Sequence, residues 1–186
     1  MNALRAKIAQ QTLKLLATYE WKLISIDMIC RKLKLSRKKI PRNIKSKIDL
    51  LKNINKYFDD LMLVEIKSVE KSTTLDMLFE ILMLRFDLLN RYRFSILKIF
   101  KFFKSNPNNF IVLIPSFIES IEMMAKSSNI ETKGMIGIMK LKGILVIYFS
   151  TFLTWIKDES SSLDKTMTVL DHYLKGTENV VKLFKK

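Results

Sequence analysis

The sequence predicts an all-α fold, and two observations carry this prediction. Only four Gly and three Pro occur among the 186 residues, so little material is available for the tight turns of a β-protein. Long stretches of Leu, Ile, Met, Phe and Lys run between these rare breakers, with apolar residues at helical spacing. The length suits one well-cored domain, or a small module fused to a larger one.

Three short helices are expected at the N-terminus, over about 4–19, 26–33 and 36–44. Ser25 suits the N-cap of the second helix, because its hydroxyl can accept a hydrogen bond from a free amide of the first turn. Ser36 is expected to cap the third helix in the same way. Since a tight turn joins the last two helices, the order is that of a helix-turn-helix module.

Pro41 stands inside the third expected helix, at the fifth position if Ser36 is the N-cap. Proline has no amide to donate to the carbonyl of Arg37, and its ring crowds that carbonyl. A regular helix here would cost up to ~3 kcal/mol, and the residue before a proline favours extended geometry. We therefore expect the third helix to be short, kinked or restarted at Pro41.

Six further helices are expected in the rest of the chain. Their approximate ranges are 46–68, 73–89, 92–103, 114–126, 128–155 and 163–184. Ser128 and Glu131 have the spacing of a capping box at the start of the fifth of these helices.

Positive charge is concentrated in the N-terminal part of the chain. Residues 1–56 carry fifteen Lys or Arg and three acids, whereas residues 57–186 carry eighteen and fifteen. The stretch RKLKLSRKKIPRNIKSK (31–47) holds nine of these cations and no acid. A compact basic module indicates a polyanionic partner, either nucleic acid or anionic lipid. A compositional bias toward Lys is the alternative explanation. Such a bias would, however, give residues 1–56 and 57–186 a similar excess of positive charge.

The expected helix around 138–156 is apolar on two faces. Such a helix is central to a core, or shared between the core and an oligomer interface. With the amphipathic helix 163–184 beside it, two copies could form a four-helix dimer interface; a core within one copy is the alternative. The residues expected at this interface are Tyr148, Phe152, Trp155, Leu170 and Leu174.

The order of these features resembles the TetR family of transcriptional regulators. Residues 8–58 are similar to its N-terminal helices, with the pair Ser46-Lys47 opening the fourth helix. The segment LKGILVIYFSTFLTWIKDESSSLDKTMTVLDHYLKGTE (141–178) resembles the end of the ligand domain in an alphaproteobacterial TetR-like group. The same segment is similar to the TetR-fold lipid-binding proteins of coenzyme Q biosynthesis.

The resemblance implies about nine helices and a homodimer. Residues 1–50 would form the DNA-binding module, and residues 51–186 a ligand-binding and dimerisation domain with an apolar pocket. Two positions depart from the family pattern. Lys34 replaces a Gly at a place that often needs a left-handed backbone, and Pro41 replaces a Tyr.

The first functional reading is a dimeric regulator, in particular a repressor, that binds double-stranded operator DNA and senses an apolar small molecule. The residues expected to contact DNA are Ser36, Arg37, Lys38, Lys39, Arg42, Asn43, Lys45 and Lys47. Among them, Arg37, Lys38 or Arg42 can donate to guanine, and Asn43 can pair with adenine. By resemblance, Lys47 would meet a phosphate.

The second reading is a lipid- or isoprenoid-binding protein, related to ubiquinone biosynthesis, that keeps a vestigial DNA-binding module. Met and Phe side chains adapt to irregular apolar space. The residues expected to line a pocket are Phe100, Phe103, Phe117, Met123, Met139 and Tyr148. In this reading the basic module would face anionic lipid, although a membrane surface is the less favoured partner.

An enzyme is the third class, and the sequence argues against it. The sole His, His172, and the sole Cys, Cys30, stand apart from any pattern of catalytic or zinc-binding residues. No cofactor or metal site is therefore expected. The longest apolar run, 143–156, is short for a membrane span, and the helical spacing of the first residues leads us to expect no secretory signal. We expect a cytoplasmic protein.

Overall fold

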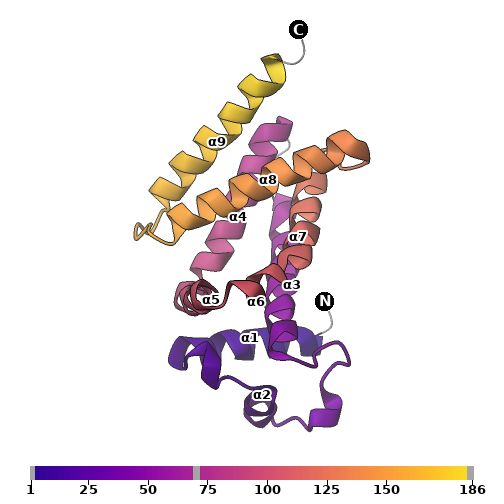
Figure 1. Cartoon of the computed structure of the whole chain (residues 1–186), viewed down its shortest axis with the longest axis vertical. Helices are drawn as coiled ribbons and strands as arrows, with labels where there is room; N and C mark the ends of the chain where they lie inside the picture. The colour runs from indigo at the N-terminus through magenta and orange to yellow at the C-terminus, as the bar shows by residue number, and fades with distance from the viewer. Residues whose placement is uncertain (1–2, 69–71, 184–186) are drawn as a thin grey trace. The chain divides into compact units, whose positions relative to one another are not determined.

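The computed structural model describes residues 3–68 and 72–183, and all regular structure in these ranges is helical (Figure 1). The nine α-helices of the described ranges are α1 (Ala3–Thr18), α2 (Ile26–Leu33), α3 (Lys47–Glu65), α4 (Thr74–Asn90), α5 (Arg93–Ser105), α6 (Pro107–Ile111), α7 (Ile114–Ser127), α8 (Gly134–Trp155) and α9 (Asp164–Leu183). Short 3-10 helices cover Trp21–Leu23, Arg37–Lys39 and Ile66–Ser68. The predicted all-α fold is confirmed.

The chain forms two compact units. The first consists of Met1–Leu63 and Leu88–Ser120, and the second of Val64–Asp87 and Ile121–Lys186. This grouping by contact is a different property from the functional division expected after residue 50, which stays a prediction.

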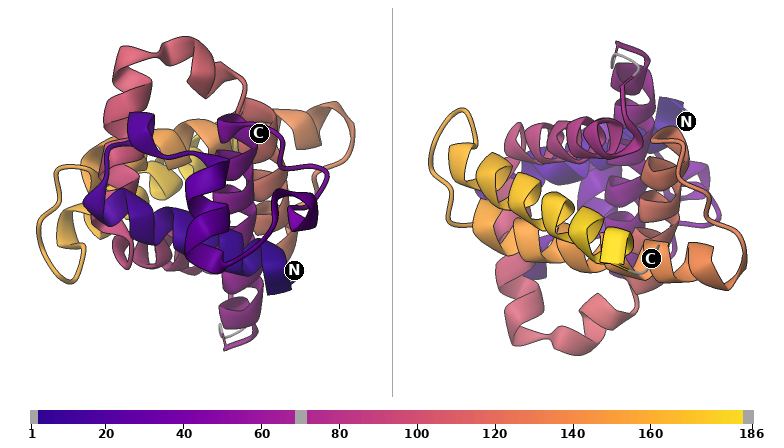
Figure 2. Two further views of the ribbon diagram at one scale, coloured as in Figure 1. Left: turned by 90° about the horizontal axis from the view of Figure 1, so that it is seen from below. Right: turned by 90° about the horizontal axis from the view of Figure 1, so that it is seen from above.

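The first unit is built on α1, which contacts both α2 and α5 (Figure 2, left). Ile8 and Leu16 of α1, Ile29 of α2 and Phe58 of α3 are buried in its core. The buried hydroxyl of Ser95 donates to the carbonyl of Leu13 at 2.7 Å and links α5 to α1. The N-terminal helices therefore rest on a packed apolar core.

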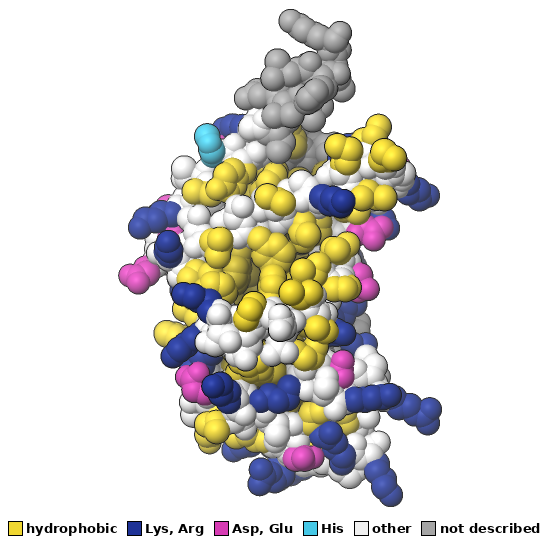
Figure 3. Space-filling view, viewed as in Figure 1, with side chains coloured by type: hydrophobic (Ala, Val, Ile, Leu, Met, Phe, Trp, Pro, Cys, Tyr) yellow, Lys and Arg dark blue, Asp and Glu magenta, His cyan; other side chains and the backbone are white. Residues whose placement is uncertain are grey.

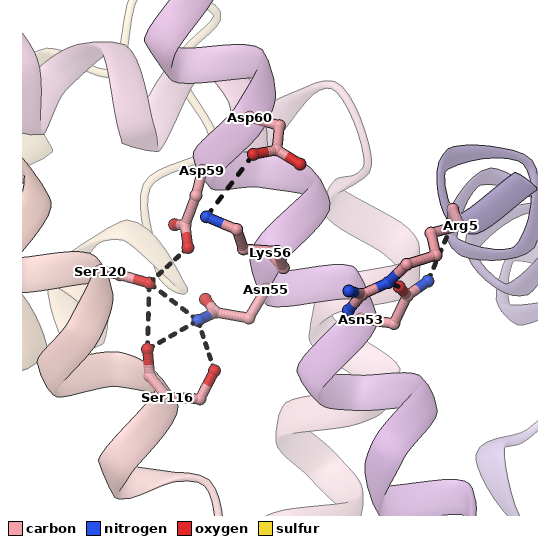
Figure 4. A network of polar contacts seen from close by, with 8 residues as sticks. All are labelled: Arg5, Asn53, Asn55, Lys56, Asp59, Asp60, Ser116 and Ser120. Carbon is pink, nitrogen blue, oxygen red and sulfur yellow. Dashed lines mark hydrogen bonds and ion pairs between the residues drawn. The ribbon is translucent and has the colours of Figure 1, made fainter. Parts of the chain in front are cut away.

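A buried polar network joins α3 to α7 within the same unit (Figure 4). The side-chain amide of Asn55 donates to the hydroxyl of Ser120 at 2.8 Å and to the carbonyl of Ser116 at 3.0 Å. The Ser120 hydroxyl in turn donates to the Asp59 carboxylate at 2.9 Å. Because buried polar groups favour the arrangement that satisfies them, this network fixes the register of α7 on α3.

The second unit has α8 and α9 side by side (Figure 2, right). The ring of Tyr148 on α8 stacks on Phe86 of α4 at a centroid distance of 5.4 Å. Trp155, at the end of α8, is fully buried. Leu170 and Leu174 on α9 are also buried, and these three side chains form the core of this pair of helices.

The start of α8 differs from the expected capping box. The helix begins at Gly134, and Ser128 belongs instead to the end of α7, where its buried hydroxyl donates to the Met124 carbonyl at 3.0 Å. The Glu131 carboxylate accepts a hydrogen bond from the Lys133 amide in the connecting turn. The capping-box prediction is wrong because Ser128 continues the hydrogen-bonded turn of α7.

Candidate nucleic-acid interface

The second helix of the N-terminal module has the expected start and end. The Ser25 hydroxyl accepts a hydrogen bond from the Met28 amide at 3.1 Å, which confirms the predicted N-cap. Lys34 ends the helix in a left-handed backbone, with φ 54° and ψ 41°. The Leu35 amide then donates to the Cys30 carbonyl at 2.9 Å. The turn of a helix-turn-helix is therefore present, and a residue with a Cβ stands at its left-handed position.

The third helix of the module is replaced by two turns. Residues Arg37–Lys39 form one turn of 3-10 helix, and Ile40 is extended, with φ −67° and ψ 135°. A second turn closes where the Ile44 amide donates to the Pro41 carbonyl at 2.8 Å. The expected effect of Pro41 is confirmed, because the helix stops at the residue before it. The N-cap expected at Ser36 is not made, since its side chain forms no capping hydrogen bond.

The two turns are held in place by apolar side chains. Ile40 and Ile44 are both buried, so the segment is anchored at two points although it lacks a helix. Around them, Arg37, Ile40, Pro41, Arg42, Ile44 and Lys45 line a shallow open notch of about 350 Å³. Two of its lining residues, Ile40 and Ile44, are buried, and three others are cations.

Many exposed side chains of this module are cations, and Figure 3 shows several Lys or Arg side chains on one face, in the lower part of the view. The exposed set is Lys22, Arg31, Lys32, Lys34, Arg37, Lys38, Lys39, Arg42 and Lys45. One acid is paired with this set, since Arg37 Nη1 lies 3.3 Å from Asp27 Oδ1. Four members were absent from the expected DNA contacts, although the charge count of 31–47 already contained three of them. Ser36 and Asn43 are exposed on the same segment.

Lys47 differs from the other expected contacts because its ammonium group points into the module. Its Nζ donates to the carbonyl of Trp21 at 2.6 Å and to that of Lys22 at 3.1 Å. The same atom lies 4.9 Å from the centre of the Trp21 ring. Burial lowers the pKa of Lys47 from its ordinary value. In this position Lys47 ties the start of α3 to the 3-10 helix after α1.

Asp49, in the first turn of α3, binds the two backbone amides that precede the helix. The Asp49 carboxylate accepts hydrogen bonds from the amides of Lys45 and Ser46 at 3.0 and 2.9 Å, and from the Ser46 hydroxyl at 2.9 Å. Burial works to raise the pKa of Asp49, but these hydrogen bonds outweigh it and the pKa is lowered. The spacing of Ser46 and Asp49 is that of a capping box, a signal that was visible in the sequence.

The residues expected to line an apolar pocket are divided between the two units. In the first unit, Phe103 and Phe117 both pack on Phe110, at ring distances of 5.5 and 5.8 Å, and Phe100 is half-buried on α5. In the second unit, Tyr148 is buried, Met123 is half-buried and Met139 is exposed. Their role around a ligand stays a prediction.

Most of the residues expected at a dimer interface lie inside the protomer. Tyr148, Trp155, Leu170 and Leu174 are buried, and Phe152 is half-buried with its ring stacked on Trp155 at 5.3 Å. Among the described side chains of these helices, the large apolar ones left exposed are different: Met135, Ile136, Ile138, Met139, Val146 and Leu153 on α8, and Met167 and Tyr173 on α9.

His172 and Cys30, which were weighed as residues of an enzyme, lie in different units of the structure. His172 is exposed on α9, and the thiol of Cys30 is buried in α2. Within the described ranges, no three His, Cys, Asp or Glu side chains are grouped so that they could hold a metal ion.

Comparison with known proteins gives the fold. No family model matches the sequence, and no curated protein matches it. The crystal structure of the TetR transcriptional regulator from Nitrosomonas europaea ATCC 19718 is similar over 94% of this chain and 97% of that one, with a TM-score of 0.73 and 18% sequence identity. The chain has the fold of a TetR transcriptional regulator, as its sequence resemblance predicted.

Proposed function

We propose that the protein is a transcriptional regulator that binds double-stranded DNA through the basic N-terminal module. The observation that carries this proposal is the set of nine exposed cations on and around α2 and the two turns that follow it. Lys and Arg at such a surface bind the phosphates of a duplex and release condensed counterions. The fold shared with a TetR transcriptional regulator supports the same function.

Phosphate contacts dominate binding in this proposal. A helix can lie in the major groove and present several side chains to base edges, whereas Arg37–Lys39 make only one 3-10 turn. We propose that Arg37, Lys38, Lys39, Arg42 and Lys45 contact phosphates, with Ser36 beside them on the DNA backbone. Among these residues Arg37, Lys38 or Arg42 can also donate to guanine, and Asn43 can pair with adenine. Lys47 reaches a phosphate only if its ammonium group leaves the carbonyls of Trp21 and Lys22.

The regulator is proposed to act as a homodimer. Val146 and Leu153 on α8 and Met167 on α9 are exposed apolar side chains that a second copy would cover. Repression in response to an apolar ligand, in a cytoplasmic setting, completes this proposal and is supported by the resemblance.

Fluorescence anisotropy with labelled duplexes tests the DNA proposal. The protein is titrated against a duplex from its own promoter region and against a scrambled duplex, at several salt concentrations. Arg37→Ala/Lys38→Ala/Lys39→Ala should weaken binding to both and reduce the salt slope by about 3, since each lost phosphate contact removes about 0.9. Lys101→Ala/Lys104→Ala/Lys157→Ala removes equal charge from exposed sites elsewhere and is the matched control. If both triple variants weaken binding equally, the module is no DNA site.

A second candidate is a TetR-fold protein that binds a lipid or isoprenoid and has lost operator reading. Residues 36–44 form no regular helix, and this observation favours the second candidate. Without that helix the module loses the element that would read bases in the major groove. Native mass spectrometry of freshly purified protein should then show a co-purifying apolar molecule. A ligand-free spectrum together with preference for the promoter duplex would exclude this candidate.

A further inference from the structure

A small cavity in the first unit lies between the segment that follows α1 and the second half of α5. Its volume is about 280 Å³, and its lining includes Glu20, Trp21, Lys22, Lys98, Phe102 and Asn106. None of the residues expected to line an apolar pocket belongs to it. Since pockets for drug-sized ligands begin at about 300 Å³, this cavity suits a ligand of one or two rings.

Positive charge prevails at the cavity, because three Lys and one Glu contribute to its lining. Lys98 Nζ lies 3.3 Å from the Ala17 carbonyl oxygen and 3.5 Å from that of Tyr19. The Glu20 carboxylate is 4.0 Å from the same atom. These contacts are longer than the roughly 2.7–2.9 Å of an ammonium–carboxylate hydrogen bond. Lys98 can therefore take a closer anionic partner.

An aromatic side chain forms one wall of the cavity. Phe102 is half-buried, so part of its surface is open to a ligand. Its ring packs on that of the buried Trp21 at a centroid distance of 6.2 Å, which holds it in place. The Asn106 side-chain amide donates to the Phe102 carbonyl at 3.0 Å and fixes the end of α5. A planar ring against Phe102 gains apolar burial and an aromatic contact.

These two features select the ligand together. The three Lys disfavour a cationic ligand, and a neutral ring would leave Lys98 without a close anionic partner. An inorganic phosphate would pair with Lys98 but leave Phe102 uncovered. We propose that the cavity binds a small aromatic carboxylate, with the carboxylate at Lys98 and the ring against Phe102.

A bound carboxylate would act on residues 17–22, which lead towards α2. Lys98 holds the start of this segment through two backbone carbonyls. Lys47 holds its end through the carbonyls of Trp21 and Lys22, at 2.6 and 3.1 Å. A carboxylate draws the Lys98 ammonium group away, because a charged acceptor is stronger than a neutral one. The segment then loses one of its two lysine attachments. An effect on DNA rests on the function proposed above.

Isothermal titration calorimetry on the full chain tests the site with 2-naphthoate and 2-naphthamide, which share a shape but differ in charge. The carboxylate should bind at least roughly tenfold more tightly, since hydrogen bonds to charged groups are the stronger ones. Lys98→Met should abolish this preference and leave the affinity for the amide unchanged, whereas Lys98→Arg should keep the preference. Lys104→Met, at an exposed site of α5 outside the lining, is the matched control and should bind both compounds like the unchanged protein.

Glu20→Gln gives a second test at a side chain that is 56% exposed. It removes the acid that competes for Lys98, so it should tighten binding of the carboxylate and leave that of the amide unchanged. Circular dichroism checks that all variants are folded.

Four outcomes would overturn the proposal. The first is equal affinity of the unchanged protein for the two compounds, or no binding of either. The second is a preference for the carboxylate that persists in Lys98→Met. The third is equal weakening of both compounds by Lys98→Met, which would make Lys98 only a cap for the carbonyls after α1. The fourth is loss of the preference in Arg37→Ala/Lys38→Ala/Lys39→Ala, which would assign the anion to the basic module.

Anisotropy separates this site from the DNA proposal. Saturating 2-naphthoate should lower the affinity for the promoter duplex at least roughly fivefold, the lower end of ordinary coupling between two sites. Lys98→Met should already have the lower affinity and show no further response. Unchanged affinity at saturation would refute the link through residues 17–22. If calorimetry shows the site and no duplex binds in either state, the DNA proposal fails and the site stands.

Discussion

The Asp158 carboxylate accepts hydrogen bonds from both the amide and the hydroxyl of Thr166, each at 2.8 Å. It also accepts one from the Ser160 hydroxyl at 2.6 Å, so a single buried side chain joins the turn after α8 to the first turn of α9. Burial works to raise the pKa of Asp158, but the hydrogen bonds from Ser160 and Thr166 prevail and lower it to about 2. This contact gives a physical role to Asp158, Ser160 and Thr166 in the segment 141–178.

Asp158→Asn should lower the free energy of unfolding by about 2 kcal/mol at neutral pH, because an amide is a weaker acceptor than a carboxylate. The folded pKa of about 2 lies below the ordinary value of 3.8. The stabilisation is therefore complete above pH 3.8 and is lost as the pH falls towards 2. Urea unfolding at pH 7 and at pH 3 measures both effects.

Asp164→Asn is the control for this prediction. Asp164 is exposed in the first turn of α9, where its charge interacts with the helix dipole alone by a few tenths of a kcal/mol. Equal losses for Asp158→Asn and Asp164→Asn would contradict the assigned role of Asp158.

Lys34→Gly should stabilise the protein by about 0.5–1 kcal/mol, since Gly adopts the left-handed backbone without a Cβ clash. Lys34 has φ 54° in the turn after α2. Thermal unfolding measures the change, and Lys34→Ala is the control because it removes the charge but keeps the strain. A gain for Lys34→Ala as large as that for Lys34→Gly would show that charge repulsion, and not backbone strain, is relieved.

Lys47→Met should destabilise the protein by about 1–2 kcal/mol, because two carbonyls lose a charged donor. Lys45→Met should leave stability nearly unchanged, since the Lys45 side chain is exposed. In anisotropy the order reverses: Lys45→Met should reduce the salt slope by about 0.9, and Lys47→Met should change it less. A reduced slope for Lys47→Met alone would mean that Lys47 leaves Trp21 when DNA binds.

Pro41→Tyr should restore helix within residues 36–44, because it supplies an amide for the Arg37 carbonyl and frees Ile40 from its extended geometry. Circular dichroism should show a small rise in helix content. The ratio of affinities for promoter and scrambled duplexes should also increase. If Pro41→Tyr raises helix content and neither protein prefers the promoter, the module is vestigial.

Ser120→Ala should cost about 1–3 kcal/mol, because the buried Asp59 carboxylate loses one donor and Asn55 loses one acceptor. Ser116→Ala should cost less, since the Ser116 carbonyl still accepts from Asn55. Urea unfolding of both variants measures the difference. Equal costs would show that the Ser120 hydroxyl contributes nothing beyond packing.

Local signals explain why much of the fold was predictable. Helix α2 begins at Ile26 and ends at Leu33 as expected, because the Ser25 cap and the change of backbone at Lys34 act over a few residues. The break at Pro41 was foreseen for the same reason, since proline imposes its geometry on its own position and on the residue before it.

Tertiary contacts explain what the sequence did not reveal. Lys47 was expected to face a phosphate, but its partners are the carbonyls of Trp21 and Lys22, more than twenty residues away. Ser128 had the spacing of a cap, but Asn129 turns left-handed and detaches it from α8. The helical periodicity of the apolar residues placed Trp155 on an apolar face of its helix. It did not show whether this face packs against α9 or against another molecule.

The buried position of Cys30 has a practical consequence. As the only thiol of the chain, it should react slowly with a chromogenic disulfide reagent while α2 is folded, and at the rate of a free thiol once α2 opens. Its labelling rate therefore reports the opening of α2 without any introduced probe. Because Cys30 reacts slowly in the folded protein, a single cysteine introduced at an exposed site of either unit would be labelled selectively. The signal of the label would then come from that site alone.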